Sequence, residues 1–324
     1  MALDIPGLSD AELQRALKQL TSLPKHEQIE LDRMLVELEK VKSIEKSQDT
    51  FLDFVNHVYP GYKVGKHHAR LAKIFEDIAN GKKKRVIVNI APRHGKSELI
   101  SYLAPAWFLG KHPDKKVIMA SHTADLAVNF GRRVRNLVGS DPYKEIFPDV
   151  ELQSDSKSAS RWGTNYQGEY FAIGVGGALA GRGADLFIID DPHSEQDAKL
   201  GKPEVFLPAW EWFQSGPIQR LMPGGAIIVV MTRWSKLDLT GQIVNQMVTN
   251  DDVDDWEIVE FPAIIEDKNG EEKALWPEFW PLEELLSKKA ALDVRYWNAQ
   301  YMQNPTSEEG ALIKREWWKI WEGE

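Results

Sequence analysis

The chain has 324 residues, of which 43% are hydrophobic and 10% aromatic, so it can bury a large core and is not disordered throughout. Its 40 Lys and Arg against 49 Asp and Glu give a net charge of −9, which argues against a protein that coats nucleic acid nonspecifically. The absence of cysteine excludes a disulfide scaffold, cysteine-ligated zinc and thiol catalysis. Because no apolar run approaches the roughly 20 residues that span a bilayer and no signal-peptide pattern is present, we expect a soluble intracellular protein with no membrane partner.

Residues 1–50 are predicted to form a helical N-terminal extension. Ser9 and Glu12 fit a capping box at the start of a short helix. From residue 26 to residue 48 there is neither Gly nor Pro, and apolar residues recur at helical spacing. We favour a helical hairpin packed on the core; an arm that docks a partner is the alternative.

Residues 51–250 are predicted to form an α/β core. The sequence predicts strands over residues 85–90, 117–120, 186–189 and 226–231, and helices over 71–78, 97–109 and 124–138. Continuous β-branched runs separated by helices favour a mostly parallel sheet that is covered by helices on both faces. Aromatic residues between 152 and 184 suggest an antiparallel hairpin in addition.

Residues 251–324 are predicted to form a small C-terminal subdomain that is largely helical. An acidic turn opens it, and six of the chain's 12 tryptophans lie between residues 276 and 321. Tryptophans this dense usually pack in a core or between domains, and we prefer that interpretation to a platform for stacking nucleic-acid bases.

The strongest local motif follows the strand predicted at residues 85–90 and precedes a helix, as a phosphate-binding loop does. Backbone N–H groups and the helix N-terminus would attract phosphates there. Lys96 is expected to reach the β- and γ-phosphates of ATP, and the Ser97 hydroxyl to ligate Mg²⁺. The motif departs from the usual pattern because Ile90 stands where the first glycine is expected. The candidate nucleotide-binding residues are Pro92, Arg93, His94, Gly95, Lys96 and Ser97.

A second motif, Asp185–Asp191, has four apolar residues followed by two carboxylates, which is the Walker B arrangement. Asp190 is expected to hold Mg²⁺ beside Ser97. Asp191 would orient and polarise the attacking water, a task that related ATPases usually give to Glu. Alone, this segment could be a strand that ends in a solvated acidic turn. Together the two motifs predict a P-loop NTPase fold of the ASCE type.

Several further motifs occur in the same chain: Leu179–Asp185 leading into Ile188–His193, Val230–Trp234, Trp276-Pro277, Tyr301–Pro305 and Gly310–Trp318. With this combination, the chain from about Tyr59 to Trp321 resembles the ATPase part of the large terminase subunit of tailed bacteriophages. That family packages DNA into proheads. The resemblance also accounts for a phosphate loop that lacks its first glycine and contains an arginine.

The resemblance implies roles for three further residues. Arg93 would contact the γ-phosphate from within the same subunit, where a guanidinium stabilises charge on the transferring phosphoryl group. Thr232 would belong to the coupling motif that senses the γ-phosphate. Arg182, in a glycine-flanked loop that we expect to be flexible, is the candidate arginine finger for a neighbouring subunit. The alternatives for that finger are Arg161, Arg132 and Arg133.

Other assignments stay open at this stage. His67 and His68 precede the first strand, where similar proteins contact adenine, and a structural role is at least as plausible. The basic clusters Lys82–Arg85 and Arg132–Arg135 are candidate contacts for DNA or a neighbouring subunit, although solvated surface is the default interpretation.

The function that the resemblance implies is an Mg²⁺-dependent ATPase motor that drives double-stranded DNA into the prohead. The implied partners are DNA, the portal protein, the small terminase subunit and further copies of the chain in a ring on the prohead. The implied location is the host bacterial cytoplasm and the prohead during packaging, not the mature virion. Members of the family continue into a nuclease domain, and we expect no nuclease in a chain that stops at Glu324. A nucleotide-gated assembly protein and a helicase-like DNA ATPase are the alternative functions.

Overall fold

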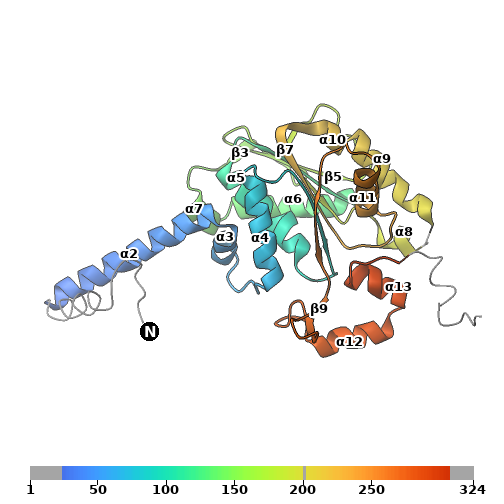
Figure 1. The fold of residues 1–324 in the computed structure, drawn as a ribbon. Coiled ribbons are helices and arrows are strands. Elements are labelled where there is room, and N and C mark those ends of the chain that lie inside the picture. The colour runs from blue at the N-terminus through green and yellow to red at the C-terminus, as the bar shows by residue number, and fades with distance from the viewer. Residues whose placement is uncertain (1–23, 200–201, 307–324) are drawn as a thin grey trace, which may run out of the picture.

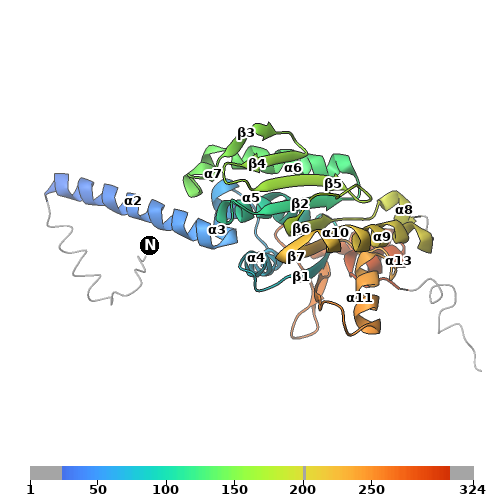
Figure 2. The same ribbon diagram turned by 90° about the horizontal axis from the view of Figure 1, so that it is seen from above.

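The computed structural model describes residues 24–199 and 202–306, and the fold that it shows is an eight-stranded sheet between two layers of helices (Figures 1 and 2). The strand order is β3-β4-β5-β2-β6-β7-β1-β8. Six strands from β5 to β8 in this order run parallel, and β4 and β3 continue the sheet antiparallel at one edge. The strands are β1 Arg85–Ile90, β2 Lys116–Ser121, β3 Leu152–Lys157, β4 Arg161–Thr164, β5 Glu169–Gly174, β6 Ala184–Asp190, β7 Leu221–Met231 and β8 Glu257–Phe261.

Successive residues of the central strands enter two different hydrophobic cores, because side chains along a strand alternate between the faces of the sheet. In β7, for example, Ile228 and Val230 lie in one core and Ile227 and Val229 in the other. The first core is covered by α3 Phe51–Val58, α4 Lys66–Ala79, the π-helix η1 Glu98–Leu103, α5 Ala104–Lys111, α6 Ala124–Val138 and α7 Asp141–Ile146. The second is covered by α9 Leu207–Ser215 and α11 Leu239–Thr249, near the short segments α8 Glu195–Lys199, η2 Pro203–Phe206 and α10 Pro217–Arg220.

The predicted mostly parallel α/β sheet is therefore confirmed, as are all four predicted strands and the antiparallel hairpin, which is β4 with β5. The domain boundary at residue 250 remains a prediction, but the sheet extends past it. β8 pairs with β1 in parallel, with Val86 opposite Glu257 and Ile90 opposite Phe261. The sequence did not predict this strand, because two glutamates interrupt its apolar residues, as is common for a strand at the edge of a sheet.

The residues after β8 form a small subdomain with its own core, which includes Ile264, Leu285 and Trp297. Its strands pair as an antiparallel hairpin, so the expectation of a largely helical subdomain holds only in part. Trp276 and Trp297 are buried, which agrees with their predicted role in packing, whereas the last three tryptophans lie outside the described residues. The elements are β9 Ile264–Glu266, β10 Glu272–Ala274, α12 Leu282–Ala291, α13 Val294–Tyr296 and the π-helix η3 Trp297–Tyr301.

The helix α2, Lys25–Asp49, projects from the body of the molecule (Figure 1). Only its last turns touch the core, where the Trp107 indole donates a hydrogen bond of 3.1 Å to the Ser47 carbonyl. Apolar side chains such as Leu38 and Val41 are about half exposed, at 51% and 54%. The favoured expectation that residues 26–48 pack on the core is thus wrong for most of this length. The first predicted helix, over residues 9–20, lies outside the described residues.

No helix among the described residues is long and apolar enough to cross a membrane.

Candidate nucleotide-binding site

The predicted phosphate loop lies where β1 ends, at the carboxyl edge of the sheet, and β6 and β7 end beside it. A cavity of about 770 Å³ opens at this edge, within the size range of small-molecule sites. The carboxyl edge is where parallel α/β sheets bind ligands, since loops from several strands converge there. The side chains around the cavity include Arg93, Lys96, Ser97, His122, Asp191 and Thr232.

The loop has an unusual backbone at two positions. Arg93 has a φ of 60° and Gly95 a φ of 81°, so both lie in the left-handed region. A Cβ atom on Gly95 would stand 2.3 Å from His68 Nε2, which leaves room for glycine alone. With these two turns the loop passes over the carboxyl end of β1 before the chain enters η1. The Arg93 side chain is exposed and lines the cavity.

Three buried histidines stabilise the backbone of the loop: His67 and His68 of α4, and His94 of the loop itself. His67 Nε2 and His68 Nε2 both lie 3.0 Å from the His94 carbonyl oxygen, and His94 Nδ1 lies 2.8 Å from the Pro92 carbonyl oxygen. Since His68 Nδ1 accepts the Gly65 N–H, its proton is on Nε2 and is donated to the loop. Burial lowers the pKa of each of the three rings to about 4, so they are neutral at pH 7. The structure thus favours a structural role for His67 and His68 over adenine contact.

Asp190 is buried at the end of β6 and receives two hydroxyl hydrogen bonds. Ser97 Oγ donates to its Oδ1 at 3.1 Å and Ser101 Oγ to its Oδ2 at 2.8 Å. Burial, and then the neighbouring charge of Asp191, raises the pKa of Asp190 above its usual range. A cation bound beside it would favour the charged carboxylate, as the ammonium of Lys96 already does in part.

These donors suit Mg²⁺, which is held in nucleotide sites by few protein oxygens together with phosphate oxygens and water. The pair of a carboxylate, Asp190, and a hydroxyl, Ser97, matches that need. Among the described residues no group of three or more His, Cys, Asp or Glu could hold a metal without a ligand's help. Asp190 and Ser97 could hold a metal whose remaining ligands are phosphate oxygens and water.

Lys96 and Asp191 face each other across the floor of the cavity, with 2.9 Å between Lys96 Nζ and Asp191 Oδ2. Burial opposes the charge of Lys96, but the carboxylates of Asp191 and Asp190 outweigh it and raise the lysine pKa. Asp191 Oδ1 accepts the Thr232 N–H at 2.9 Å, and the Thr232 hydroxyl donates to the Ile90 carbonyl at 3.0 Å. Thr232 thus joins the second carboxylate to the start of the phosphate loop.

Asp238 organises the segment after Thr232 and was not singled out from the sequence. Its buried carboxylate accepts hydrogen bonds from the Arg233 guanidinium and from the backbone N–H groups of Trp234 and Gly241. The last of these makes it the N-cap of α11, and an Asp before an apolar helix is the signal that could have identified it.

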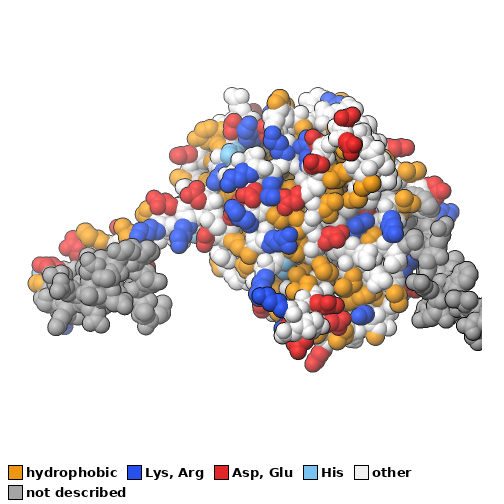
Figure 3. All heavy atoms as spheres, in the orientation of Figure 1, with side chains coloured by type: hydrophobic (Ala, Val, Ile, Leu, Met, Phe, Trp, Pro, Cys, Tyr) orange, Lys and Arg blue, Asp and Glu red, His pale blue; other side chains and the backbone are white. Residues whose placement is uncertain are grey.

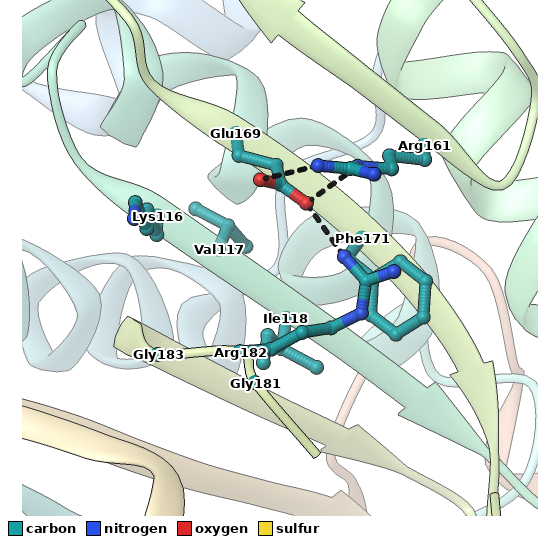
Figure 4. A pocket seen from close by; sticks show the side chains of 9 residues that line it. All are labelled: Lys116, Val117, Ile118, Arg161, Glu169, Phe171, Gly181, Arg182 and Gly183. Carbon is teal, nitrogen blue, oxygen red and sulfur yellow. Dashed lines mark hydrogen bonds and ion pairs between the residues drawn. The ribbon is translucent and has the colours of Figure 1, made fainter. Parts of the chain in front are cut away.

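Arg182 lies away from this cavity. It precedes the amino end of β6, and the first residue of this strand lies about 20 Å from Asp190 at the other end. Arg182 Nη1 donates to Glu169 Oε1 at 2.8 Å, and its guanidinium lies 3.6 Å from the Phe171 ring centroid. Arg161 Nε binds the same carboxylate oxygen at 2.9 Å, so Glu169 lies between the two arginines (Figure 4). Arg182 is therefore held by two side chains at the amino ends of strands β5 and β6. The sequence had instead suggested that it lies in a flexible loop.

The remaining finger candidates occupy different places. Arg133 lies near the cavity of its own chain, where it pairs with Glu98 at 2.5 Å and stacks over Tyr102. Arg161 shares the Glu169 cluster with Arg182. The structure thus brings together all the predicted residues of the phosphate loop with Asp190, Asp191 and Thr232, and separates Arg182 from them.

The strand order defines the class of protein. β7 lies between β1, which carries the phosphate loop, and β6, which carries the two carboxylates. An additional strand between these two is the mark of ASCE P-loop NTPases, and the fold prediction is confirmed.

Comparison with known families then narrows the class. Residues 87–204 match the family model described as the N-terminal part of the T4likevirus-type terminase large subunit. The resemblance that the sequence motifs indicate is confirmed over these residues. A comparison with curated proteins found no match.

Solved structures of phage terminases are also similar to the chain. A mutant of the Thermus phage P74-26 large terminase ATPase domain shares 16% identity, with 76% of this chain and 96% of that chain covered and a TM-score of 0.49. The HK97 bacteriophage large terminase shares 15% identity over 74% of this chain, with a TM-score of 0.49. The large terminase of a thermophilic bacteriophage, solved in complex with ADP, shares 8% identity over 74% of this chain, with a TM-score of 0.43. The chain spans about half the length of the latter two, 50% and 52%.

Proposed function

We propose that the protein is the ATPase motor of a phage large terminase subunit, which uses Mg²⁺ and ATP to move double-stranded DNA into a prohead. The observation that carries this proposal is the convergence of Lys96 and Ser97 with Asp191 and Asp190 at one edge of an ASCE sheet. The family model that matches residues 87–204 supports the same assignment. Turnover of ATP that depends on Lys96 is the test, and it is developed in the Discussion.

The chemistry follows from the positions of the side chains. Lys96 neutralises the β- and γ-phosphates, and Arg93, exposed in the cavity, is free to contact the γ-phosphate. When phosphates recruit Lys96, the Asp191 oxygen that it binds becomes available to orient the attacking water. Mg²⁺ bound with the nucleotide supplies charge neutralisation on the phosphates. Thr232, hydrogen-bonded to both Asp191 and the loop, relays the change to the segment after β7.

The position of Arg182 suits an arginine finger that acts on a neighbouring subunit. It cannot reach the cavity of its own chain, because β6 separates the two. It lies on the surface of the opposite edge, where a neighbour in a ring could present its nucleotide.

Replacing Arg182 with alanine is therefore expected to lower ATP turnover about tenfold or more at protein concentrations where subunits associate, and to leave the residual turnover of dilute protein unchanged. Steady-state hydrolysis across a dilution series measures this. Arg161→Ala, which removes the other guanidinium on Glu169, separates the two arginines of this cluster: a concentration-dependent loss in Arg161→Ala and not in Arg182→Ala would assign the finger to Arg161. An equal loss at every dilution would assign Arg182 to its own subunit or to structure alone.

A basic face on α4 and the turn after it is the candidate DNA contact. Of the predicted cluster Lys82–Arg85, Lys83 is paired with Glu257 and Arg85 with Asp254. Lys82 and Lys84 form no ion pair within the described residues, and neither does the exposed Lys66 on α4. Lys and Arg side chains gather over this part of the surface (Figure 3). Such unpaired cations are what a phosphate backbone requires.

Changing Lys66, Lys82 and Lys84 together to alanine is expected to weaken binding to a random DNA duplex and to reduce the magnitude of the salt slope of log K by about 2–3. Fluorescence anisotropy at several salt concentrations measures both quantities.

The control changes Lys40, Lys42 and Lys46 to alanine, three exposed lysines of the projecting helix α2. It removes the same charge at another place. If both triple variants lose affinity equally, net charge and not the α4 face determines binding.

The remaining partners follow from the proposed motor. A ring of further copies on the prohead, the portal protein and the small terminase subunit are its expected contacts, in the host bacterial cytoplasm. The three-part division into residues 1–50, 51–250 and 251–324 belongs to the same proposal.

A further inference from the structure

We propose that Trp280 of the C-terminal subdomain is a positioning residue for Arg93, and that it acts by fixing the peptide that follows this arginine. The inference rests on the proposed ATPase function and names a part of the site that neither the sequence motifs nor the family resemblance supplies. Trp280 lies just before α12, 187 residues from Arg93 in the sequence, and belongs to the subdomain after β8.

The contact is a hydrogen bond at the most unusual peptide of the phosphate loop. Trp280 Nε1 donates to the Arg93 carbonyl oxygen at 3.2 Å. Arg93 has a φ of 60°, a conformation that costs free energy for a residue other than glycine and persists only when its surroundings hold it. The next carbonyl, that of His94, receives the two histidine hydrogen bonds. Two successive carbonyls are thus held, the first by the subdomain and the second by α4.

The indole is itself held in place on several sides. Its ring is nearly parallel to the His94 ring, with 6.4 Å between centroids and 25° between planes. Lys288 of α12 places its ammonium 4.8 Å from the Trp280 ring centroid, and Phe279 packs against the ring edge-on. A side chain with these contacts can fix a partner, since its own rotamer is restricted.

The consequence concerns the direction of the Arg93 side chain. Cβ and the carbonyl carbon are bonded to the same Cα, so a backbone that is held on both sides of the Arg93 Cα determines where the Cα–Cβ bond points. Within the described residues the Arg93 guanidinium forms no ion pair that could orient it instead. The backbone anchor at Trp280 is therefore what directs the arginine toward the γ-phosphate. It also makes the arginine's position depend on how the C-terminal subdomain sits against the loop.

The test is a double-mutant cycle on ATP hydrolysis by the full chain, using Trp280→Phe and Arg93→Ala. Phenylalanine keeps an aromatic ring but lacks the N–H donor and is smaller than the indole, so a control for the loss of ring size is needed. We expect Trp280→Phe to lower kcat about fivefold, the effect of losing one hydrogen bond, with KM and the Kd for ATP within about twofold of the native values. In the Arg93→Ala background the same change should have no further effect, because the arginine that it positions is gone.

Trp210→Phe is the matched control. Trp210 is also half-buried and packs on a phenylalanine, Phe213, but it lies in α9 and does not line the nucleotide cavity. A general loss of stability would lower turnover in both variants, and thermal unfolding would reveal it.

Two results would overturn the inference: an unchanged kcat in Trp280→Phe, or an equal fold-loss in the native and Arg93→Ala backgrounds. Either leaves the proposed function intact. Failure of the proposed function is seen separately, as an absence of Lys96-dependent turnover in the native chain.

Discussion

Replacing Lys96 with alanine is expected to reduce ATP hydrolysis by at least about 10³-fold, equivalent to ~4 kcal/mol of lost transition-state stabilisation. The Lys96 ammonium is buried at the phosphate loop, and alanine leaves no positive charge at that position. Initial rates with radiolabelled ATP provide the sensitivity that such a loss requires.

The fold should survive this substitution. Asp191, the partner that loses its ion pair, is 30% exposed at its side chain and keeps the hydrogen bond from the Thr232 N–H. Its charge can therefore be hydrated, and we expect a change in Tm of only a few degrees. Circular dichroism and thermal unfolding check this, and normal turnover in the folded variant would remove the phosphate-loop assignment.

The second large effect is expected at Asp191. Asparagine keeps the size of the side chain and can still accept the Thr232 N–H, but it has no negative charge with which to polarise water. We expect kcat to fall about 10²- to 10³-fold, within the range that general-base catalysis contributes. ATP affinity should be retained or should rise, because the charge of Asp191 no longer competes with the phosphates for Lys96.

Equilibrium binding and single-turnover hydrolysis separate these two quantities for Asp191→Asn. Asp191→Glu is the informative companion, since related ATPases usually carry Glu at this place and its carboxylate should support turnover. A native rate in the asparagine variant would place the catalytic base elsewhere.

Local sequence patterns were sufficient to predict the residues of the site that follow directly after strands β1 and β6. The apolar strands β1 and β6 each lead directly into their polar motif, so the sequence predicts both the element and the edge at which Lys96 and Asp190 meet. The family resemblance then identified Thr232, whose position beside Asp191 no local pattern indicates.

What the sequence could not predict depends on contacts between distant segments. The hydrogen bonds of His67 and His68 to the loop join residues 27 and 26 positions apart, and that of Trp280 joins residues 187 apart. The glycines around Arg182 suggested mobility, but its restraint comes from Glu169 and Phe171 on a neighbouring strand. These contacts form only in the tertiary fold, and no local sequence pattern indicates them.

The most direct test of the central claim is ATP hydrolysis with Mg²⁺ across a series of protein concentrations, with Lys96→Ala as the blank. We predict turnover above the blank that rises faster than linearly with concentration, because a neighbouring subunit completes the site. Binding of ATP without turnover above the blank at any concentration would contradict the account and favour a nucleotide-gated assembly protein.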